Sequence, residues 1–340
     1  MYHLQHDFPL KSNNTFGISA NAKHYLTVDS PDDLIRFFKE NNPEKNEKRL
    51  FLGAGSNLLF IHNFDGIVIH PEIDGIHLIS ENPDIAVVEA GAGVIWDQFV
   101  EWCVERGFGG VENLSLIPGN VGAVPVQNIG AYGTEAESVI AEVKGIDLDK
   151  LEIKSFNHSE CQFGYRTSLF KVELKERFIV TSVIFHLTKQ PDFHLEYGAL
   201  KAEVSRLGGI NLENIRKAVI SIRESKLPDP AKVGNAGSFF KNPIVPEVIA
   251  TDLKKSYPDM PVYPAGEGLV KLAAGWLIEK TGWKGRSVGN AAVHDKQALV
   301  IINKGGATGK EIFDLSEKVV NDVLQKFNIE LEREVLVIGN

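Results

Sequence analysis

The sequence is poor in cysteine and in long apolar runs, and its net charge is not positive. Two cysteines, Cys103 and Cys161, occur in 340 residues, too few and too separate for a disulfide framework or a cysteine metal site. No apolar run approaches the roughly 18 residues of a membrane span. Residues 1–11 lack a basic segment followed by an apolar run, so we expect no secretory signal. These absences predict a cytoplasmic protein without a membrane anchor.

Charge and histidine spacing exclude further classes of protein. The net charge of −9 argues against nucleic acid or an anionic membrane as a partner. It still permits a phosphate-bearing ligand, because backbone amides and a few local cations can bind one. The ten histidines show no metal-ligand spacing such as H-E-x-x-H. We therefore expect no metal site.

Length predicts two or three domains, and periodicity predicts the α+β class. At 340 residues the chain exceeds the usual size of one domain. Ser30 and Pro31 are typical of a helix start, with Leu34, Phe37 and Phe38 as its buried face. Apolar spacing or turn signals predict helices at 96–104, 212–224, 245–256, 269–281 and 309–327, and strands at 49–52, 66–70, 85–90, 143–148, 177–187, 297–303 and 331–338.

The segment 107–133 has a different texture, rich in Gly, Asn and Pro and almost without periodicity. A structureless run of this length inside a domain favours a binding loop. Neither early glycine loop matches a Rossmann fingerprint, because the third glycine is absent from one and Trp96 replaces a small residue in the other. Several loops can nevertheless converge as amide nests on a pyrophosphate, namely 53–57, 91–93, 118–122 and 128–133.

A series of motifs, in order and at similar spacing over almost the whole chain, resembles the UDP-N-acetylenolpyruvoylglucosamine reductases, also called UDP-N-acetylmuramate dehydrogenases. The Tyr197-Gly198 segment is similar to an extra loop of the longer, enteric-type branch. The motifs are Asn14–Gly17, Gly53–Asn57, Ile117–Gly122, Gln127–Gly133, Phe163–Arg166, Lys226–Pro228, Gly234–Pro243, Lys271–Ile278 and Leu331–Val335.

The resemblance implies a vanillyl-alcohol-oxidase-type (PCMH-type) FAD-binding fold in two subdomains and an α+β domain for the UDP-sugar. The expected boundaries are 1–70 with the returning strand 329–340, then 71–225, and 226–328 for the UDP-sugar, with the FAD region at about 17–188. FAD is expected to be non-covalent, since the loop around Pro118-Gly119-Asn120 has no histidine. NADPH would reduce FAD, and the enolpyruvyl ether of the UDP-sugar would take the hydride during peptidoglycan precursor synthesis. A monomer is expected.

The same resemblance implies three catalytic residues. Hydride addition to the enolpyruvyl group leaves an enolate conjugated with a carboxylate, so the site must stabilise negative charge and deliver a proton. Arg166 would bind the carboxylate, since guanidinium is a planar donor pair. Glu334 would donate to the enolate if burial keeps it protonated. Ser238 would protonate the carbon.

The remaining site residues carried over are expected to bind the two ligands. Those for FAD are Gly53, Ala54, Gly55, Ser56, Asn57, Pro118, Gly119, Asn120, Val121, Gly122, Gln127, Asn128, Gly130, Ala131, Tyr132, Gly133 and Tyr165. Those for the UDP-sugar are Tyr197, Lys226, Asn242, Tyr263, Lys271 and Gln297.

Other interpretations remain open at this point. Taken alone, Ser238 is typical of a turn or cap, Glu334 of a solvent-facing strand and Arg166 of a surface cation. A flavin-dependent oxidase of the same fold, or a non-catalytic sugar-nucleotide sensor, would also explain the glycine loops. One residue departs from the family pattern: Arg333 precedes Glu334 where many relatives carry proline.

Overall fold

The computed structural model describes residues 1–41 and 47–339, and these residues form two compact units. Neither unit is one continuous stretch of chain. Unit 1 comprises Met1–Phe8, Ala22–Ala54 and Asp65–Ser225. Unit 2 comprises Pro9–Asn21, Gly55–Phe64 and Lys226–Asn340.

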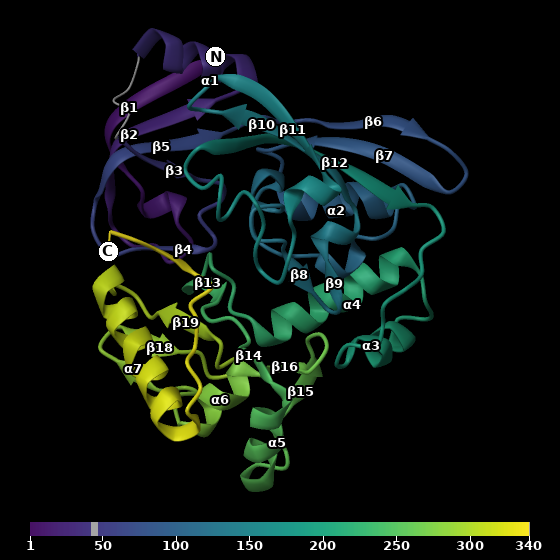
Figure 1. Cartoon of the computed structure of the whole chain (residues 1–340), viewed down its shortest axis with the longest axis vertical. Helices are drawn as coiled ribbons and strands as arrows, with labels where there is room; N and C mark the ends of the chain where they lie inside the picture. The colour runs from purple at the N-terminus through teal and green to yellow at the C-terminus, as the bar shows by residue number, and fades with distance from the viewer. Residues whose placement is uncertain (42–46, 340) are drawn as a thin grey trace. The chain divides into compact units, whose positions relative to one another are not determined.

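The first sheet of unit 1 packs against a helix whose N-terminus is capped. Helix α1 (Pro31–Asn41) begins where the sequence predicts, and Ser30 Oγ accepts the Asp33 backbone N–H at 3.2 Å. Its buried face of Leu34, Phe37 and Phe38 packs into a core shared with the sheet (Figure 1). The strand order is β1-β2-β5-β3, with β1 Tyr2–Pro9, β2 Asn21–Val28, β5 Phe64–Pro71 and β3 Lys48–Phe51.

The second sheet of unit 1 is antiparallel and carries the larger core. Helix α2 (Trp96–Glu105) buries Trp96, Phe99 and Val100 in this core. Two more helices of unit 1 follow the sheet in the chain, α3 (Leu200–Arg206) and α4 (Leu212–Lys226). The strand order is β11-β10-β12-β7-β6, with β11 Glu152–Asn157, β10 Ile140–Asp147, β12 Phe178–Thr188, β7 Ile85–Gly91 and β6 Ile76–Glu81.

The segment 107–133 is irregular, as its composition predicts. It is mostly turns, held by main-chain hydrogen bonds to its neighbours. The regular pieces in and just after it are short: the 3₁₀ helices η2 (Glu112–Leu114), η3 (Val121–Ala123) and η4 (Ala136–Ser138), and the paired strands β8 (Gly130–Ala131) and β9 (Thr134–Glu135).

Unit 2 contains two small sheets and the parallel pair of β4 (Leu58–Phe60) with β20 (Leu336–Ile338). Helix α7 (Gly309–Phe327) packs on one sheet, and α5 (Glu247–Ser256) packs on the other (Figure 1). The sheet under α7 has the order β13-β19-β18-β17, with β13 Gly234–Ser238, β19 Val300–Asn303, β18 Ala291–Val293 and β17 Ser287–Val288. The sheet under α5 has the order β14-β16-β15, with β14 Ile244–Pro246, β16 Leu269–Leu272 and β15 Val262–Pro264.

Three predicted elements of unit 2 are wrong in extent. The helix expected at 269–281 is a strand, β16, followed by the shorter helix α6 (Ala274–Lys280). Strand β16 is the central strand of its sheet and pairs on both sides, so cross-strand pairing outweighs the helical spacing. The strand expected at 297–303 begins at Val300, and the strand expected at 331–338 is confined to β20.

Among residues 1–41 and 47–339, none of the helices combines the length and the apolar character needed to cross a bilayer.

We predict that both thiols are unreactive in the folded protein. Burial raises the pKa of Cys161 to about 12 and raises the pKa of Cys103 as well, so neither forms the reactive thiolate at neutral pH. A chromogenic disulfide reagent should label neither cysteine in native protein and both after denaturation. Rapid labelling of one thiol in the native protein would contradict the burial of that cysteine.

Candidate functional site

Three of the predicted cofactor loops meet in unit 1. The Val121 N–H donates to Val94 O at 2.8 Å, and the Gly122 N–H donates to Ala92 O at 3.0 Å. A Cβ added to Gly53 would lie 3.2 Å from Asn120 Oδ1, which brings the first loop against the third. The 53–54, 91–93 and 118–122 segments therefore line one region, as the sequence predicts.

The fourth loop, 128–133, also lies in unit 1, where hydrogen bonds connect it to neighbouring turns. The Ile129 N–H donates to Val124 O at 3.3 Å, and Asn113 Nδ2 donates to Tyr132 O at 2.9 Å. Asn128 and Tyr132 both have positive φ angles, 45° and 48°. Non-glycine residues seldom adopt this conformation, and it is concentrated at turns and ligand-binding segments.

The first loop belongs to both units. Gly53 and Ala54 are in unit 1, whereas Gly55, Ser56 and Asn57 are in unit 2. Asn57 Nδ2 donates to Glu334 O at 3.1 Å, and the Leu336 N–H donates to Asn57 O at 3.0 Å. A predicted cofactor residue therefore holds the backbone of a predicted catalytic residue.

The buried polar atoms around these loops fit a dinucleotide such as FAD. Asn120 Oδ1 and Arg223 Nε are buried and have no hydrogen-bond partner in the part of the chain that the structure describes. Such atoms are rare in native proteins and call for a ligand or water. A flavin dinucleotide offers donors, acceptors and phosphate oxygens, so it can pair with the acceptor Asn120 Oδ1 and with the donor Arg223 Nε.

Arg223 is a candidate that the sequence did not reveal. It lies in α4 (Leu212–Lys226), three residues before the Lys226-Leu227-Pro228 motif. Burial lowers the pKa of its guanidinium, against the opposing effects of Tyr132 and Asp97. No sequence signal marked it, because helical spacing alone does not tell a buried arginine from an exposed one.

Arg166 lies at the tip of a tight turn whose shape is set by its neighbours. The Gly164 and Thr167 backbones exchange hydrogen bonds of 3.1 Å, and Arg166 has a φ of 56°. Its Nη1 and Nη2 donate to Asn128 O at 3.2 Å and Gly130 O at 2.7 Å. A Cβ on Gly130 would lie 2.9 Å from Arg166 Nη1, so any other residue here would require the guanidinium to shift.

Ser238 and Glu334 are brought together within unit 2. Ser238 ends β13 and is paired with Val300 of β19. The Glu334 N–H donates to the carbonyl of Phe239, the residue after Ser238, at 2.9 Å. Two of the three predicted catalytic residues thus lie on adjacent backbone segments that are far apart in the sequence.

Asn235 holds the backbone around Ser238. Its buried side chain donates to Pro228 O at 3.1 Å and Val233 O at 2.9 Å, and accepts the Gly237 N–H at 3.0 Å. A bulge interrupts the β13–β19 register between Asn235 and Ser238, and Gly237 has a φ of 67°. The sequence placed Asn235 in a motif but gave it no role, since its three contacts depend on the folded chain.

Arg333, the departure from the family pattern, anchors the segment of Glu334 to α7. Its Nε donates to the buried Ser316 Oγ at 3.0 Å, and its Nη2 pairs with Glu317. The guanidinium also lies 4.8 Å from the Phe313 ring centroid, which adds a cation–π contact. The arginine therefore supplies side-chain contacts to the segment that presents Glu334.

Most predicted UDP-sugar residues lie in unit 2, and three of them, Asn242, Tyr263 and Lys271, lie in or next to the sheet β14-β16-β15. Tyr263 pairs with Lys271 across β15 and β16, and Asn242 Oδ1 accepts the Ala274 N–H at the start of α6 at 2.9 Å. Gln297 Oε1 accepts the Leu299 N–H at 3.3 Å. Lys226 is exposed at the start of the unit's last stretch. Tyr197 lies in unit 1, with its ring centroid 6.0 Å from that of Tyr132.

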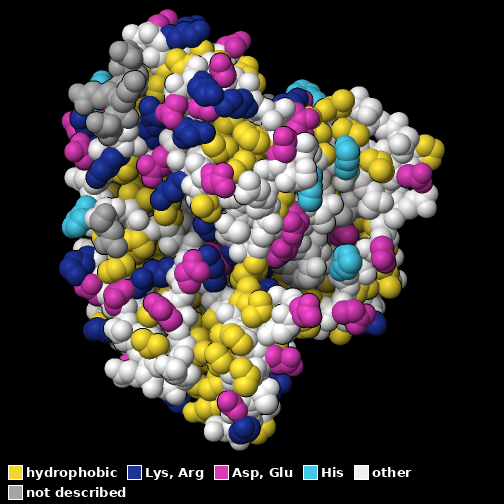
Figure 2. All heavy atoms as spheres, in the orientation of Figure 1, with side chains coloured by type: hydrophobic (Ala, Val, Ile, Leu, Met, Phe, Trp, Pro, Cys, Tyr) yellow, Lys and Arg dark blue, Asp and Glu magenta, His cyan; other side chains and the backbone are white. Residues whose placement is uncertain are grey.

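Exposed apolar side chains gather on this sheet and on α5, as the face in Figure 2 shows. Contiguous exposed apolar surface often marks a binding site. These side chains surround the strands of Tyr263 and Lys271, where an aromatic ring and a cation suit a nucleotide. They are Ile244, Val248, Ile249, Tyr263 and Leu269.

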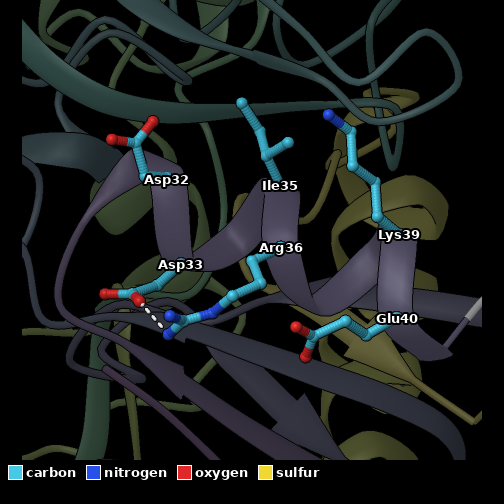
Figure 3. Close-up of a pocket in the computed structure, with 6 residues that line it drawn as sticks. All are labelled: Asp32, Asp33, Ile35, Arg36, Lys39 and Glu40. Atoms are coloured by element: carbon cyan, nitrogen blue, oxygen red, sulfur yellow. Dashed lines mark hydrogen bonds and ion pairs between the residues drawn. The ribbon is translucent and has the colours of Figure 1, made fainter.

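A shallow pocket of about 410 Å³ lies along α1, and none of the predicted site residues lines it (Figure 3). Arg36 pairs with Asp33 at 2.5 Å there. The hydrogen bond from the Met1 amine lowers the pKa of Asp33. Asp33 is therefore engaged by both Arg36 and the Met1 amine. In residues 1–41 and 47–339, no group of three or more His, Cys, Asp or Glu side chains is arranged to hold a metal ion.

Comparison with known proteins gives matches over both units. Residues 229–338 match the family model of the UDP-N-acetylenolpyruvoylglucosamine reductase C-terminal domain, and residues 22–149 match an FAD binding domain. A UDP-N-acetylenolpyruvoylglucosamine reductase of Flavobacterium johnsoniae is 47% identical over 98% of this chain and 99% of its own. One of Bacteroides fragilis is 44% identical, with 98% and 99% covered.

A solved structure supports the fold. The crystal structure of UDP-N-acetylenolpyruvylglucosamine reductase from Thermus caldophilus superposes with a TM-score of 0.70 at 24% identity, covering 100% of this chain and 99% of that one. Together with the match to an FAD binding domain, this confirms the α+β flavin-binding fold that the motifs imply.

We predict that Arg333→Ala lowers the free energy of unfolding by about 1–3 kcal/mol, the range for losing hydrogen bonds to and from a charged group. Urea denaturation of the full chain measures this change. The control is Glu317→Gln, which leaves the contacts with Ser316 and Phe313 and should cost less. Equal stability of Arg333→Ala and the wild type would show that the side chain does not anchor the segment.

Proposed function

This chain belongs to the UDP-N-acetylenolpyruvoylglucosamine reductase family, and we propose that Ser238, Glu334 and Arg166 are its catalytic residues. The protein is an FAD-dependent oxidoreductase that reduces UDP-N-acetylglucosamine enolpyruvate to UDP-N-acetylmuramate, a peptidoglycan precursor. The observation that carries the proposal is the hydrogen bond from the Glu334 N–H to Phe239 O, which lays Glu334 alongside the residue that follows Ser238.

The reaction requires charge stabilisation and one proton from the protein. Bound FAD, reduced by NADPH, supplies the hydride. Its addition to the terminal vinyl carbon leaves an electron pair on the carbon that bears the carboxylate. The side chains must therefore hold a species with almost two negative charges and protonate that carbon.

Arg166 is suited to bind the substrate carboxylate. Its guanidinium is planar and presents parallel donors that match the two oxygens of a carboxylate. The carbonyls of Asn128 and Gly130 and the Tyr165 ring, whose centroid lies 5.5 Å from its Cζ, fix the side chain in one orientation. A fixed donor loses little conformational entropy on binding, so it can position the substrate at a low entropic cost.

Ser238 and Glu334 are suited to the proton transfer. The hydroxyl of Ser238 is a weak acid, but the carbon it protonates is a strong base, so the transfer is downhill. Glu334 in its neutral form would donate a hydrogen bond to the enolate oxygen. Both lie on backbone fixed by inter-segment hydrogen bonds, as a site that must hold a short proton-transfer distance requires.

The UDP-sugar and FAD are assigned to separate sets of residues. Lys226, Asn242, Tyr263, Lys271 and Gln297 of unit 2 and Tyr197 of unit 1 would bind the UDP-sugar, with lysines for phosphate and aromatic rings for the base. The glycine loops within about 17–188 would bind FAD, within subdomains 1–70 and 71–225, and 226–328 would form the substrate domain. The protein would act as a cytoplasmic monomer, without nucleic acid or membrane.

Anaerobic flavin spectroscopy tests the whole function. We expect purified protein to be yellow, to be bleached by NADPH, and to regain its colour on addition of UDP-N-acetylglucosamine enolpyruvate. Colourless protein would indicate a sensor. Reoxidation by air but not by the enolpyruvyl sugar would indicate an oxidase. Either result would overturn the proposal.

The role of Ser238 has its own test. In Ser238→Ala, bleaching by NADPH should remain at the wild-type rate, while turnover falls by about 10²–10⁴-fold because a positioned general acid is lost. Stopped-flow kinetics separates the two half-reactions. Ser287→Ala, an exposed serine of β17, is the matched control. Near-wild-type turnover in Ser238→Ala would remove this residue from the mechanism.

A further inference from the structure

Asp97, the second residue of α2, joins two segments that are distant in the sequence. Its Oδ1 accepts the Leu116 backbone N–H at 2.5 Å. Both of its oxygens also accept from Arg216 of α4, at 2.6 Å from Nη1 and 3.0 Å from Nη2. The carboxylate is therefore shared between a helix and the irregular segment that leads into the predicted FAD loop.

Leu116 needs such support because of its backbone conformation. Its φ of 58° lies in the left-handed region, which a branched side chain seldom adopts without outside contacts. The segment is fixed on either side by Trp96, whose Nε1 donates to Leu114 O at 2.9 Å and whose N–H donates to Gly119 O at 3.0 Å. The bond from Leu116 to Asp97 fixes the stretch between these two points.

The charge of Asp97 is held by its surroundings. Burial raises the pKa of Asp97, but hydrogen bonds from Arg216 and from the Leu116 N–H outweigh it, and the net pKa lies below the usual value. The Arg216 side chain is 10% exposed and that of Asp97 26%. Ion pairs with so little solvent contact add little net stability, because desolvation offsets the attraction. A gain in stability alone therefore does not account for the pair.

We propose that Asp97 is a positioning residue for FAD binding, which holds Leu116 and hence the 118–122 loop in its binding conformation with Arg216 as its counter-ion. The proposal rests on the assignment of that loop to FAD above. Only one residue separates Leu116 from the 118–122 loop. Within the loop, Asn120 Nδ2 donates a hydrogen bond to Gly93 O at 2.6 Å. A shift at Leu116 would move Pro118 and Gly119 against this fixed point, and so displace their backbone groups from the pyrophosphate.

The contacts of Asp97 determine which variants test its role. Asp97→Leu removes both the acceptor and the charge while keeping a side chain that branches at Cγ. Asp97→Asn keeps an oxygen for the Leu116 N–H and loses the ion pair. Glu101→Gln removes the other, 58% exposed carboxylate that pairs with Arg216 and leaves Leu116 untouched. Val100→Ala truncates a fully buried side chain of the same helix, which provides a control for general destabilisation.

The dissociation constant of FAD, titrated into the deflavinated full chain, is the readout, with the thermal midpoint of the same protein as the measure of folding. We expect Asp97→Leu to bind FAD at least about tenfold more weakly than Val100→Ala, the size expected for a lost hydrogen bond to a charged group. Asp97→Asn should fall between Asp97→Leu and the wild type, and Glu101→Gln should bind as the wild type does.

Equal FAD affinity in Asp97→Leu and Val100→Ala would overturn the proposal, as would a loss in Glu101→Gln as large as that in Asp97→Leu. These outcomes are independent of the proposed function, which the wild type tests. A wild type that turns over while Asp97→Leu keeps its affinity refutes only the role of Asp97. A wild type that binds no FAD refutes the function itself.

Discussion

The arrangement of unit 2 depends on the hydrogen bonds between the last segment of the chain and residues 239–241. The Glu334 N–H bonds to Phe239 O, and the Lys241 N–H bonds to Glu332 O. These bonds hold together two segments that are separated by a long stretch of chain. Bringing the ends of that stretch together costs conformational entropy, whichever residues form the bonds. Packing of Phe239 and Phe240, which are almost fully buried, offsets that loss. The positions of Ser238 and Glu334 follow from this one pairing.

In unit 1 as well, hydrogen bonds between distant segments position the predicted site residues. Main-chain hydrogen bonds place the glycine loops, while a few buried polar side chains fix the parts that have no regular partner. Asn128 bonds to Gly164 O and to the Glu137 N–H, and Asp97 bonds to Leu116. Irregular backbone must satisfy its polar groups locally, so such side chains are needed wherever a binding loop replaces a helix or strand.

Much of this could be predicted from the sequence where local signals are strong. Helix α7 has the predicted bounds, because Thr308 and Glu311 form a capping box and Asn328 ends it in a left-handed conformation. The helix predicted at 269–281 was wrong in its first part. The sequence pattern there suits a helix, but the strands that pair with β16 lie elsewhere in the chain, so a local pattern does not reveal them. The predicted site residues came from motifs. These motifs did not include Arg223 and assigned no role to Asn235, because the roles of both residues arise from burial and from contacts made only on folding.

The pairing of β20 with β4 bears on how the protein is made. In the two-stranded sheet that they form, β4 occupies residues near the beginning of the chain and β20 residues near its end. During translation β4 leaves the ribosome long before its partner exists, so the sheet can form only after β20 has been synthesised as well. A chain shortened by a premature stop codon would lack β20 together with Glu334, and would lose a strand and a proposed catalytic carboxyl at once.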